Sequence, residues 1–313
     1  MKNQHFLWPK TKIRLKNFFG FNSVKKLEKR LGKMFPSAFP VVCSSGRVAL
    51  FIALQESKLD RKKTLKVFPF ASHCVINIVG QITSPNYNNN FIDDSELIYH
   101  QWGYSHKTNM NKLIEDSVDS LYVPGSNLLS QGGQFEIWSL NKILGSSSGG
   151  VLWCKSKDEA ERVRKKIKYS PFVFFQWMLR IFSLKFLKLY KYWNAAENGY
   201  LGISIFQSNE IWNMLNKWDI IIEDRLNKIS RLKEYSIIDD LNSDTRLPCV
   251  ININPETLLS SDYKNQVIGI RHFDKNRNSN SRELIKVVPV PIHQDVAIDE
   301  INQLISNLNK VSL

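Results

Sequence analysis

Residues 39–57, FPVVCSSGRVALFIALQES, contain the strand, turn and helix from which we infer the fold. The first five residues form an apolar run that predicts a short buried strand, and the small residues at 44–46 predict a turn. In the segment that follows, Val48, Phe51 and Ile52 recur at helical spacing. Strand, short turn and helix together are the unit from which α/β proteins are built, so the stretch predicts that fold class.

Further short apolar runs in the first half of the chain predict additional strands. They lie at 65–68, 90–93, 112–115, 135–139 and 149–154. Strands that alternate with helices are typical of a mainly parallel sheet. We therefore predict an α/β architecture with one mainly parallel central sheet between residues 36 and 160.

In the second half of the chain, the apolar residues recur mostly at helical spacing. Apolar residues spaced three to seven apart over 208–232 predict one long amphipathic helix. Strand-like runs at 248–253 and 284–290 precede a last helix. We therefore predict a large domain over residues 1–233 and a small α+β domain over residues 234–313.

Composition describes an ordinary folded chain with an excess of positive charge. Of the 313 residues, 43% are hydrophobic and 23% charged, which excludes wholesale disorder. The chain has 43 Lys and Arg against 29 Asp and Glu, a formal net charge of +14. This balance favours an anionic partner, which leaves phosphorylated metabolites, nucleic acid and an acidic membrane surface open.

The cysteines and the first residues indicate the compartment. Four cysteines lie far apart without a CxxC pair, which argues against a disulfide framework or a zinc site and fits a reduced compartment. Charged residues interrupt the first 16 residues too often for a signal peptide, and lysines interrupt the longer apolar runs. We expect a cytoplasmic protein.

Three positions in the α/β half carry residue types suited to chemistry. The turn at 44–47 precedes a helix, whose first amides and dipole favour a phosphate group; an ordinary tight turn is the alternative. Asp116 follows Glu115 at the end of a strand, where α/β proteins bind ligands; a solvated helix cap is the alternative.

The third position is Lys142, between an aromatic strand and a glycine–serine turn. A desolvated lysine there loses its proton more readily and acts as a nucleophile, although most lysines of a basic chain are simply exposed. Phosphate-binding turn, acidic residue and lysine, in this order, are what a pyridoxal-phosphate enzyme requires. The lysine holds the aldehyde as a Schiff base, and the carboxylate keeps the pyridine nitrogen protonated.

Several further segments, in the same order along residues 24–310, make the chain resemble the DegT/DnrJ/StrS family of nucleotide-sugar aminotransferases. The matching segments are Ser45-Gly46-Arg47-Val48-Ala49-Leu50, Phe68-Pro69-Phe70-Ala71-Ser72-His73, His100-Gln101-Trp102-Gly103, Glu115-Asp116-Ser117-Val118-Asp119, Ile137-Trp138-Ser139-Leu140-Asn141-Lys142, Gly149-Gly150, Gly269-Ile270-Arg271 and Val287-Val288-Pro289-Val290-Pro291-Ile292-His293. The resemblance implies a fold-type-I pyridoxal-phosphate protein that works as a homodimer, with the active site at the subunit interface.

The resemblance also implies a role for each matching residue. Lys142 would form the Schiff base and later move the proton between substrate and cofactor carbons. Asp116 would pair with the pyridinium nitrogen, His73 would stack on the ring face, and Asp119, where the family usually has glutamine, would lie near the ring hydroxyl. The phosphate would be held by the amides of Gly46 and Arg47, within the Ser45-Gly46-Arg47 turn, together with Ser139.

The sequence also departs from the family pattern. The helix between Gly103 and Asp116 is missing, and Ser139 lies three residues before Lys142 instead of five. Arg47 replaces a threonine, and the loop before the final Pro-x-His segment is shortened to about 271–282. An Asn-Tyr-Arg element, supplied in the family to the neighbouring subunit, has its nearest match at Asn198-Gly199-Tyr200.

Residues 171–193, PFVFFQWMLRIFSLKFLKLYKYW, combine aromatic residues with basic ones at helical spacing. A helix with aromatics opposite lysines suits an anionic membrane surface; packing into a dimer interface or against the large domain is the alternative, which we favour. Basic patches at 61–63 and 162–168 have no nucleic-acid recognition motif beside them, so nucleic acid is not an expected partner.

The sequence thus favours an aminotransferase that moves an amino group, with glutamate as donor, to a nucleotide-linked keto-deoxysugar used in surface polysaccharide or glycoside synthesis. The departures favour a different hypothesis, a non-catalytic scaffold that keeps the fold. Retention of both Lys142 and Asp116 argues against the scaffold. A pyridoxal-phosphate sugar dehydratase is a further alternative, but related dehydratases replace the lysine with histidine.

Overall fold

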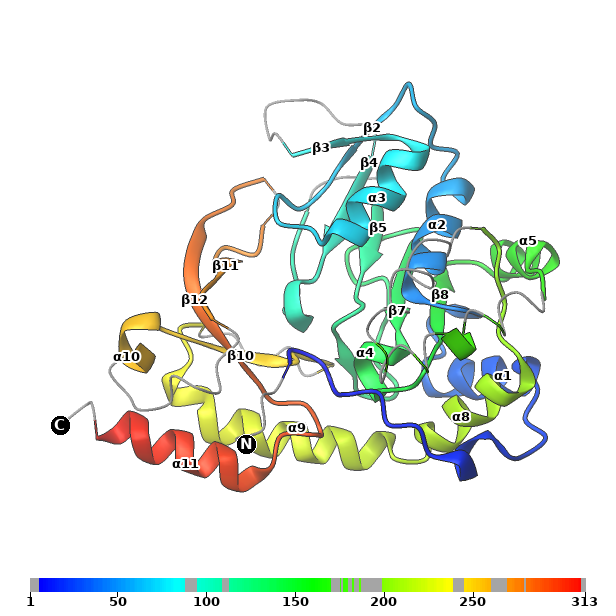
Figure 1. Cartoon of the computed structure of the whole chain (residues 1–313). Helices are drawn as coiled ribbons and strands as arrows, with labels where there is room; N and C mark the ends of the chain where they lie inside the picture. The colour runs from blue at the N-terminus through cyan, green and yellow to red at the C-terminus, as the bar shows by residue number, and fades with distance from the viewer. Residues whose placement is uncertain are drawn as a thin grey trace.

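The computed structural model describes most of the chain. Its described residues are 6–87, 95–108, 113–169, 175, 177–179, 182, 186, 199–238, 245–259, 269–278 and 280–310. A seven-stranded sheet, a three-stranded sheet, a two-stranded pair and the helices around them make up the described part (Figure 1). Among its helices, none is long and apolar enough to span a membrane. The predicted strand at 90–93 and most of the aromatic segment 171–193 lie outside the described residues.

Seven of the described strands form the central sheet, in the order β1-β8-β7-β5-β4-β2-β3. The strands are β1 (Phe39–Cys43), β2 (Thr64–Lys66), β3 (Ser84–Asn86), β4 (Ser95–Tyr99), β5 (Leu113–Asp116), β7 (Phe135–Ser139) and β8 (Gly150–Cys154). Neighbours from β3 to β7 run parallel, whereas β8 is antiparallel to both β1 and β7. The predicted mainly parallel α/β sheet is therefore confirmed.

Side chains alternate between the two faces of this sheet because successive residues of a strand point in opposite directions. Val41 and Ile137 enter a core shared with α2 (Gly46–Glu56), α3 (His73–Ile82) and α5 (Lys157–Lys166). Val42 and Trp138 enter the other core, which includes residues of α1 (Val24–Met34), α8 (Ile205–Leu215) and α9 (Trp218–Leu232). Both faces are covered, which explains why the strands read as continuous apolar runs.

The long helix predicted over 208–232 is wrong, because the structure has two helices, α8 and α9, that meet at residues 216–217. Arg30 Nη1 donates hydrogen bonds to the Trp212 carbonyl at 3.0 Å and to Asn216 Oδ1 at 2.8 Å. The Trp212 carbonyl is the group that residue 216 would reach in a continuous helix. The indole of Trp218, the first residue of α9, donates to the Tyr122 carbonyl at 2.9 Å. The helical spacing of apolar residues continues across residues 216–217, so the sequence pattern does not reveal the break between the two helices.

A second, antiparallel sheet lies in the C-terminal part of the described chain. It has the order β10-β12-β11 and consists of β10 (Val250–Ile253), β11 (Arg271–Asp274) and β12 (Leu284–Pro291). Its apolar residues join the core that also contains α9 and α11 (Ile298–Asn309). The proposed boundary between residues 233 and 234 falls one residue after the end of α9, and the division into 1–233 and 234–313 stays a prediction.

Shorter elements complete the described chain. They are η1 (Leu15–Phe18), η2 (Gln101–Gly103), β6 (Leu121–Tyr122), α4 (Leu140–Leu144), η4 (Lys233–Tyr235), β9 (Arg246–Leu247) and α10 (Pro255–Leu259). The pair β6–β9 connects the chain after β5 to the C-terminal part. The helix α4 follows β7 directly and carries Lys142.

Candidate active site

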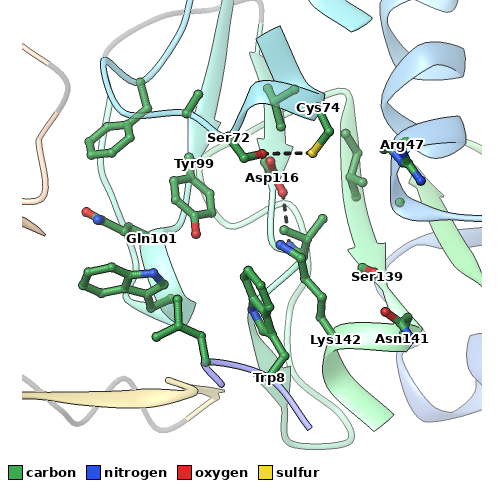
Figure 2. A pocket seen from close by; sticks show the side chains of 18 of the residues that line it. Trp8, Arg47, Ser72, Cys74, Tyr99, Gln101, Asp116, Ser139, Asn141 and Lys142 are labelled. Carbon is green, nitrogen blue, oxygen red and sulfur yellow. Dashed lines mark hydrogen bonds between the residues drawn. The ribbon is translucent and has the colours of Figure 1, made fainter. Parts of the chain in front are cut away.

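Three neighbouring strands of the central sheet end at the same edge. Tyr99 ends β4 opposite Asp116 at the end of β5, and Ser139 ends β7 beyond it. The carboxyl ends of parallel strands are the usual ligand-binding edge of an α/β sheet. A cavity of about 890 Å³ opens here, and all three residues line it together with Lys142 (Figure 2).

One end of the cavity has the character of an anion site. The first residues of α2, Gly46 and Arg47, line it, and Ser45 caps the helix by accepting a hydrogen bond from the Val48 amide at 3.2 Å. Amides of a first helical turn have no partner within the helix and suit an anion. A Cβ added to Gly46 would lie 3.2 Å from Ser139 Cβ, so this hydroxyl side chain faces the same turn.

A glycine on β8 allows this turn to lie so close to the sheet. A Cβ added to Gly150 would lie 2.2 Å from the carbonyl carbon of Ser45, a distance that no side chain tolerates. The Gly149-Gly150 pair picked out from the sequence therefore shapes the turn that holds Ser45 and Gly46.

Lys142 reaches the cavity from the first turns of α4. Its Nζ donates a hydrogen bond to Asp119 Oδ1 at 3.0 Å and lies 4.1 Å from the centre of the Trp8 ring. Burial lowers the pKa of Lys142, but the carboxylates of Asp119 and Asp116 outweigh burial and raise the pKa above its ordinary value. The amine is therefore protonated at neutral pH in the protein alone.

Asp116 is the buried carboxyl of the cavity. Burial raises the pKa of Asp116 to about 7, against the opposing effect of Lys142 and with a further increase from Asp119. The Val118 amide donates to Asp116 Oδ1 at 3.2 Å. A positive charge brought beside this carboxyl would favour its ionised form.

Asp119 lies behind Lys142 and is almost completely buried. Its Oδ1 accepts hydrogen bonds from Lys142 Nζ and from Trp8 Nε1, the latter at 2.6 Å, and its Oδ2 accepts one from the Tyr99 hydroxyl. The carboxylate is fixed from three directions and holds the lysine in one orientation.

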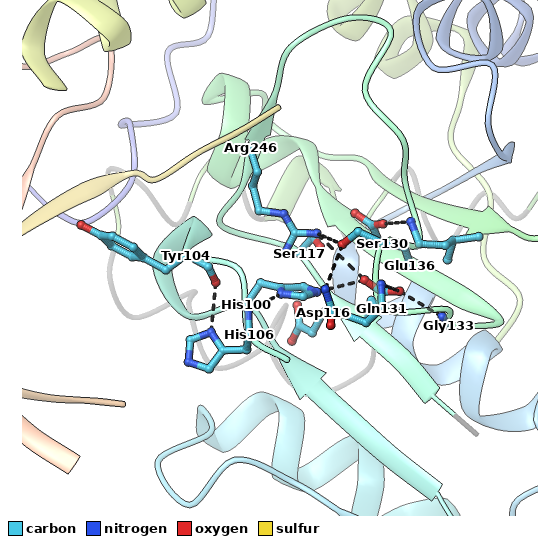
Figure 3. A network of polar contacts seen from close by, with 12 residues as sticks. His100, Tyr104, His106, Asp116, Ser117, Ser130, Gln131, Gly133, Glu136 and Arg246 are labelled. Atoms are coloured by element: carbon cyan, nitrogen blue, oxygen red, sulfur yellow. Dashed lines mark hydrogen bonds and ion pairs between the residues drawn. The ribbon is translucent and has the colours of Figure 1, made fainter. Parts of the chain in front are cut away.

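Glu115, the neighbour of Asp116, points to the opposite face of β5. Its polar partners include His100, Gln131, Gly133 and Arg246, which Figure 3 labels. It accepts hydrogen bonds from the amides of Gln131 and Gly133 and contacts His100 Nε2 at 3.1 Å. Arg246 of β9 lies 4.0 Å from it. Burial raises the pKa of Glu115 and lowers that of His100. Glu115 thus belongs to a buried polar network beneath the cavity, and of these two carboxyls Asp116 is the one that lines the cavity.

The structure does not bring His73 to this site. Of the described residues, the cavity lining includes Ser72, Cys74 and Phe70 from the same segment but not His73, which is exposed. The His73 ring lies 3.4 Å from the Asn77 side chain, one helical turn further along α3. The geometry gives the ring-stacking role expected of His73 no support.

Several lining residues were not identified from the sequence. Tyr99 stands opposite Asp116 at a strand end, so the argument that led to Asp116 extends to it. Ile270 and Arg271 belong to the Gly269-Ile270-Arg271 segment of the family resemblance, which gave them no role in the cavity. Trp8 and His272 come from segments remote in sequence, and no local pattern marks them. His272 stacks on Phe70 with ring centres 4.7 Å apart, which brings the small antiparallel sheet to the cavity.

The residues present fit pyridoxal phosphate. A helix N-terminus with the adjacent Ser139 suits its phosphate, the buried carboxyl of Asp116 suits its ring nitrogen, and Lys142 supplies the amine for its aldehyde. The absence of a side chain at Gly46 leaves room for the phosphate, because a methyl group added there would crowd Ser139.

Solved structures of sugar aminotransferases share this fold. A structure titled "Putative sugar aminotransferase Spr1654 from Streptococcus pneumoniae, PMP-form" matches with a TM-score of 0.63 and 12% identity over 97% of both chains. A DegT DnrJ EryC1 StrS aminotransferase from Brucella abortus matches with a TM-score of 0.57 and 12% identity over 92% of this chain and 89% of that one. DesV of S. venezuelae matches with a TM-score of 0.59 and 13% identity over 93% and 89%.

These likenesses confirm the fold that the DegT/DnrJ/StrS resemblance predicted. No curated protein sequence matches the chain. A protein-family model described as "Putative PLP-dependent aminotransferase" matches residues 27–312, almost the whole chain. The protein therefore belongs to this family of pyridoxal-phosphate-dependent aminotransferases.

Proposed function

We propose that this enzyme transfers an amino group from glutamate to a keto group of a nucleotide-linked deoxysugar, with Lys142 as the catalytic residue. The observation that carries the proposal is the presence of Lys142, Asp116 and the α2 N-terminus around one cavity. Bound pyridoxal phosphate supplies an aldehyde that exchanges amines and a ring that accepts electrons.

We assign a separate role to each of several residues of the cavity. Gly46, Arg47 and Ser139 line the cavity and would bind the cofactor's phosphate, and Asp116 in its ionised form would hold the proton on the ring nitrogen. Lys142 would hold the cofactor through its amine, and its Nζ would also hold and move a proton. Asp119, which binds Lys142, orients that nitrogen.

The cavity also carries charge that suits anionic substrates. Lys10 and Arg271 line it in addition to Arg47. Both substrates of the proposed reaction are anions, since glutamate has two carboxylates and a nucleotide sugar has a diphosphate. The two bind in turn in a transamination, so the same cations serve both.

The experiment that tests the proposal is the visible spectrum of the purified protein with pyridoxal phosphate, before and after borohydride. We expect a Schiff-base band that borohydride fixes on Lys142 and that glutamate bleaches with release of 2-oxoglutarate. Lys142→Ala should lose the band, while Lys10→Ala, the control at another lysine of the cavity, should keep it. A fixed adduct in Lys142→Ala would show that the assignment is wrong, and no band in the unaltered protein would favour the scaffold hypothesis.

The sugar side is tested with a panel of nucleotide-linked keto-sugars offered to the amine form of the enzyme. We expect return of the Schiff-base band with one nucleotide class and competition by the matching nucleoside diphosphate. Arg271→Gln should raise KM for the nucleotide sugar more than it lowers kcat. Turnover of simple keto acids alone would contradict the sugar assignment.

The proposed enzyme is a homodimer. Apolar side chains of Phe19, Phe21, Ile205 and Phe206 are exposed around η1 and the start of α8. These elements are joined, since Asn209 Nδ2 donates to the carbonyls of residues 18 and 20. An exposed apolar patch of this kind supports a subunit interface. We expect Phe21→Asp to lower the mass measured by analytical ultracentrifugation, and Tyr87→Asp, at the far edge of the sheet, to leave it unchanged.

Contact with an anionic membrane surface through 171–193 stays the alternative for the same region. At the described positions of that segment, Phe175, Phe182 and Phe186 are exposed, and Trp177 contacts Phe18 with ring centres 5.4 Å apart. Cosedimentation with anionic vesicles, without a change of mass in Phe21→Asp, would favour the membrane. No disulfide links the four cysteines, all of which lie in the described part of the chain. This supports the cytoplasmic location that we propose.

A further inference from the structure

The N-terminal segment, residues 6–12, forms part of the cavity wall. Residues 6–10 line the cavity, and Trp8 lies beside Lys142 (Figure 2). These residues precede the segment that matches the family, which begins at residue 27. The wall over the lysine is therefore supplied by a part of the chain outside the family match.

The Trp8 indole contacts both members of the Lys142–Asp119 ion pair. Its Nε1 donates to Asp119 Oδ1 at 2.6 Å, the same oxygen that accepts from Lys142 Nζ at 3.0 Å. Its ring lies under the ammonium, 4.1 Å from Nζ to the ring centre. A ring face attracts a cation, and the attraction grows when water is excluded.

Hydrogen bonds at both ends of the segment keep Trp8 in place. His293 Nε2 contacts the Phe6 carbonyl at 2.8 Å, and Asp295 accepts from the Lys10 amide at 2.8 Å and from Lys12 Nζ at 2.5 Å. Asn141 Nδ2 donates to Thr11 Oγ1 at 2.9 Å, so the helix that carries Lys142 also binds the segment. The indole is thus fixed relative to the amine that it covers.

We propose that Trp8 is a positioning residue for Lys142: its N–H fixes the Asp119 carboxylate and its ring covers the ammonium, so that the segment controls the charge and the accessibility of the amine that takes up the cofactor. The inference rests on the proposed role of Lys142. Without Trp8, the ammonium keeps one carboxylate partner but loses the ring face that stabilises its charge.

The test is competitive labelling of lysines in the cofactor-free protein. The protein is acetylated with trace reagent between pH 7 and 11, and the rate at Lys142 is read by peptide mass spectrometry against the other lysines. In Trp8→Leu, the midpoint of the Lys142 profile should move to lower pH, with a roughly threefold to thirtyfold higher rate at pH 8. Trp8→Phe, which keeps a ring but lacks the N–H, should show a smaller shift and serves as the milder variant.

A matched control exists at Trp212, whose ring lies 4.8 Å from the Arg30 guanidinium on another face. Trp212→Leu should leave the Lys142 profile unchanged. Simple loosening of the segment would raise the rate at every pH without moving the midpoint, and an unchanged midpoint in both Trp8 variants would overturn the inference. Borohydride fixation of cofactor on another lysine would overturn the proposed function instead, whatever the labelling shows.

Discussion

The Lys142 ammonium donates its hydrogen bond to Asp119 at 3.0 Å, while Asp116 in the same cavity accepts from the backbone amide of Val118. The two carboxyls thereby differ in their surroundings. Asp119 is the fixed partner of the amine, and Asp116 is buried, with its pKa raised to about 7. Asp116 is available to a positively charged ring nitrogen, which would favour its ionised form.

The first prediction concerns the stability of the cofactor-free protein against pH. Because burial raises the pKa of Asp116 from 3.8 to about 7, the folded state binds its proton more tightly than the unfolded state does. The resulting stability is complete below about pH 4 and is lost as the pH rises towards 7. Between pH 5 and 8, Tm should therefore fall more in the unaltered protein than in Asp116→Asn.

Scanning fluorimetry of the two proteins without cofactor measures this difference. Titrating groups that do not interact with Asp116 contribute equally to both proteins and cancel. With pyridoxal phosphate present, Tm should fall less between pH 5 and 8 in the unaltered protein than in Asp116→Asn. The reason is that the asparagine variant cannot hold the proton on the ring nitrogen. Parallel Tm curves without cofactor would show that Asp116 has an ordinary pKa.

A second prediction concerns the turn at Gly46, where we propose that the phosphate binds. The methyl group of Gly46→Ala would lie 3.2 Å from Ser139 Cβ and 3.4 Å from a Val118 methyl carbon, in the space assigned to the phosphate. We expect cofactor affinity about tenfold weaker or worse, since about 1.4 kcal/mol corresponds to a factor of ten. Fluorescence titration with pyridoxal phosphate measures it.

The control for this variant is Gly80→Ala in α3, where an added Cβ meets nothing within 4 Å. That change should leave cofactor affinity unaltered and raise stability slightly, because alanine favours a helix by about 0.5–1 kcal/mol over glycine. Equal affinities of the two variants would place the phosphate elsewhere.

The third prediction separates His73 from Phe70. Because His73 is exposed and outside the cavity, His73→Ala should change kcat/KM and the cofactor spectrum little. Phe70→Ala removes a lining side chain that stacks on His272, so it should lower kcat/KM by about tenfold, the effect of roughly 1.4 kcal/mol. Steady-state rates with the best nucleotide sugar measure both. A loss in His73→Ala alone would restore the role that the family resemblance implies.

The sequence was sufficient to predict the parts of the site that depend on local pattern. The strand, turn and helix around Ser45, and the strand ends at Asp116 and Ser139, lie where apolar runs and small residues indicated. His73 lies outside the cavity lining, and its role stays a prediction. Each residue along a helix is turned by about 100° around the axis from the one before, so alignment of a short segment does not fix which side chain enters a cavity. Trp8 depends on contacts with Asp119, 111 residues away, and no local pattern encodes such a contact.

The last prediction concerns the buried network beneath the cavity. Arg246 is almost completely buried, lies 4.0 Å from Glu115 Oε2, and has its guanidinium 4.9 Å from the centre of the Tyr122 ring. Arg246→Met keeps the aliphatic volume but leaves Glu115 without its cation, so we expect a loss of about 3–5 kcal/mol in the free energy of unfolding. Urea unfolding of the cofactor-free protein measures it.

Arg231→Met is the matched control, because Arg231 is exposed and hydrogen-bonds only to the exposed side chains of Asn227 and Asn302 among the partners described. The free energy of unfolding of Arg231→Met should stay within about 0.5 kcal/mol of that of the unaltered protein. Adding Glu115→Gln to Arg246→Met should recover part of the stability, because the neutral amide no longer needs a cation in the interior. If the double variant is no more stable than Arg246→Met, the arginine acts through packing on Tyr122 and not through its charge.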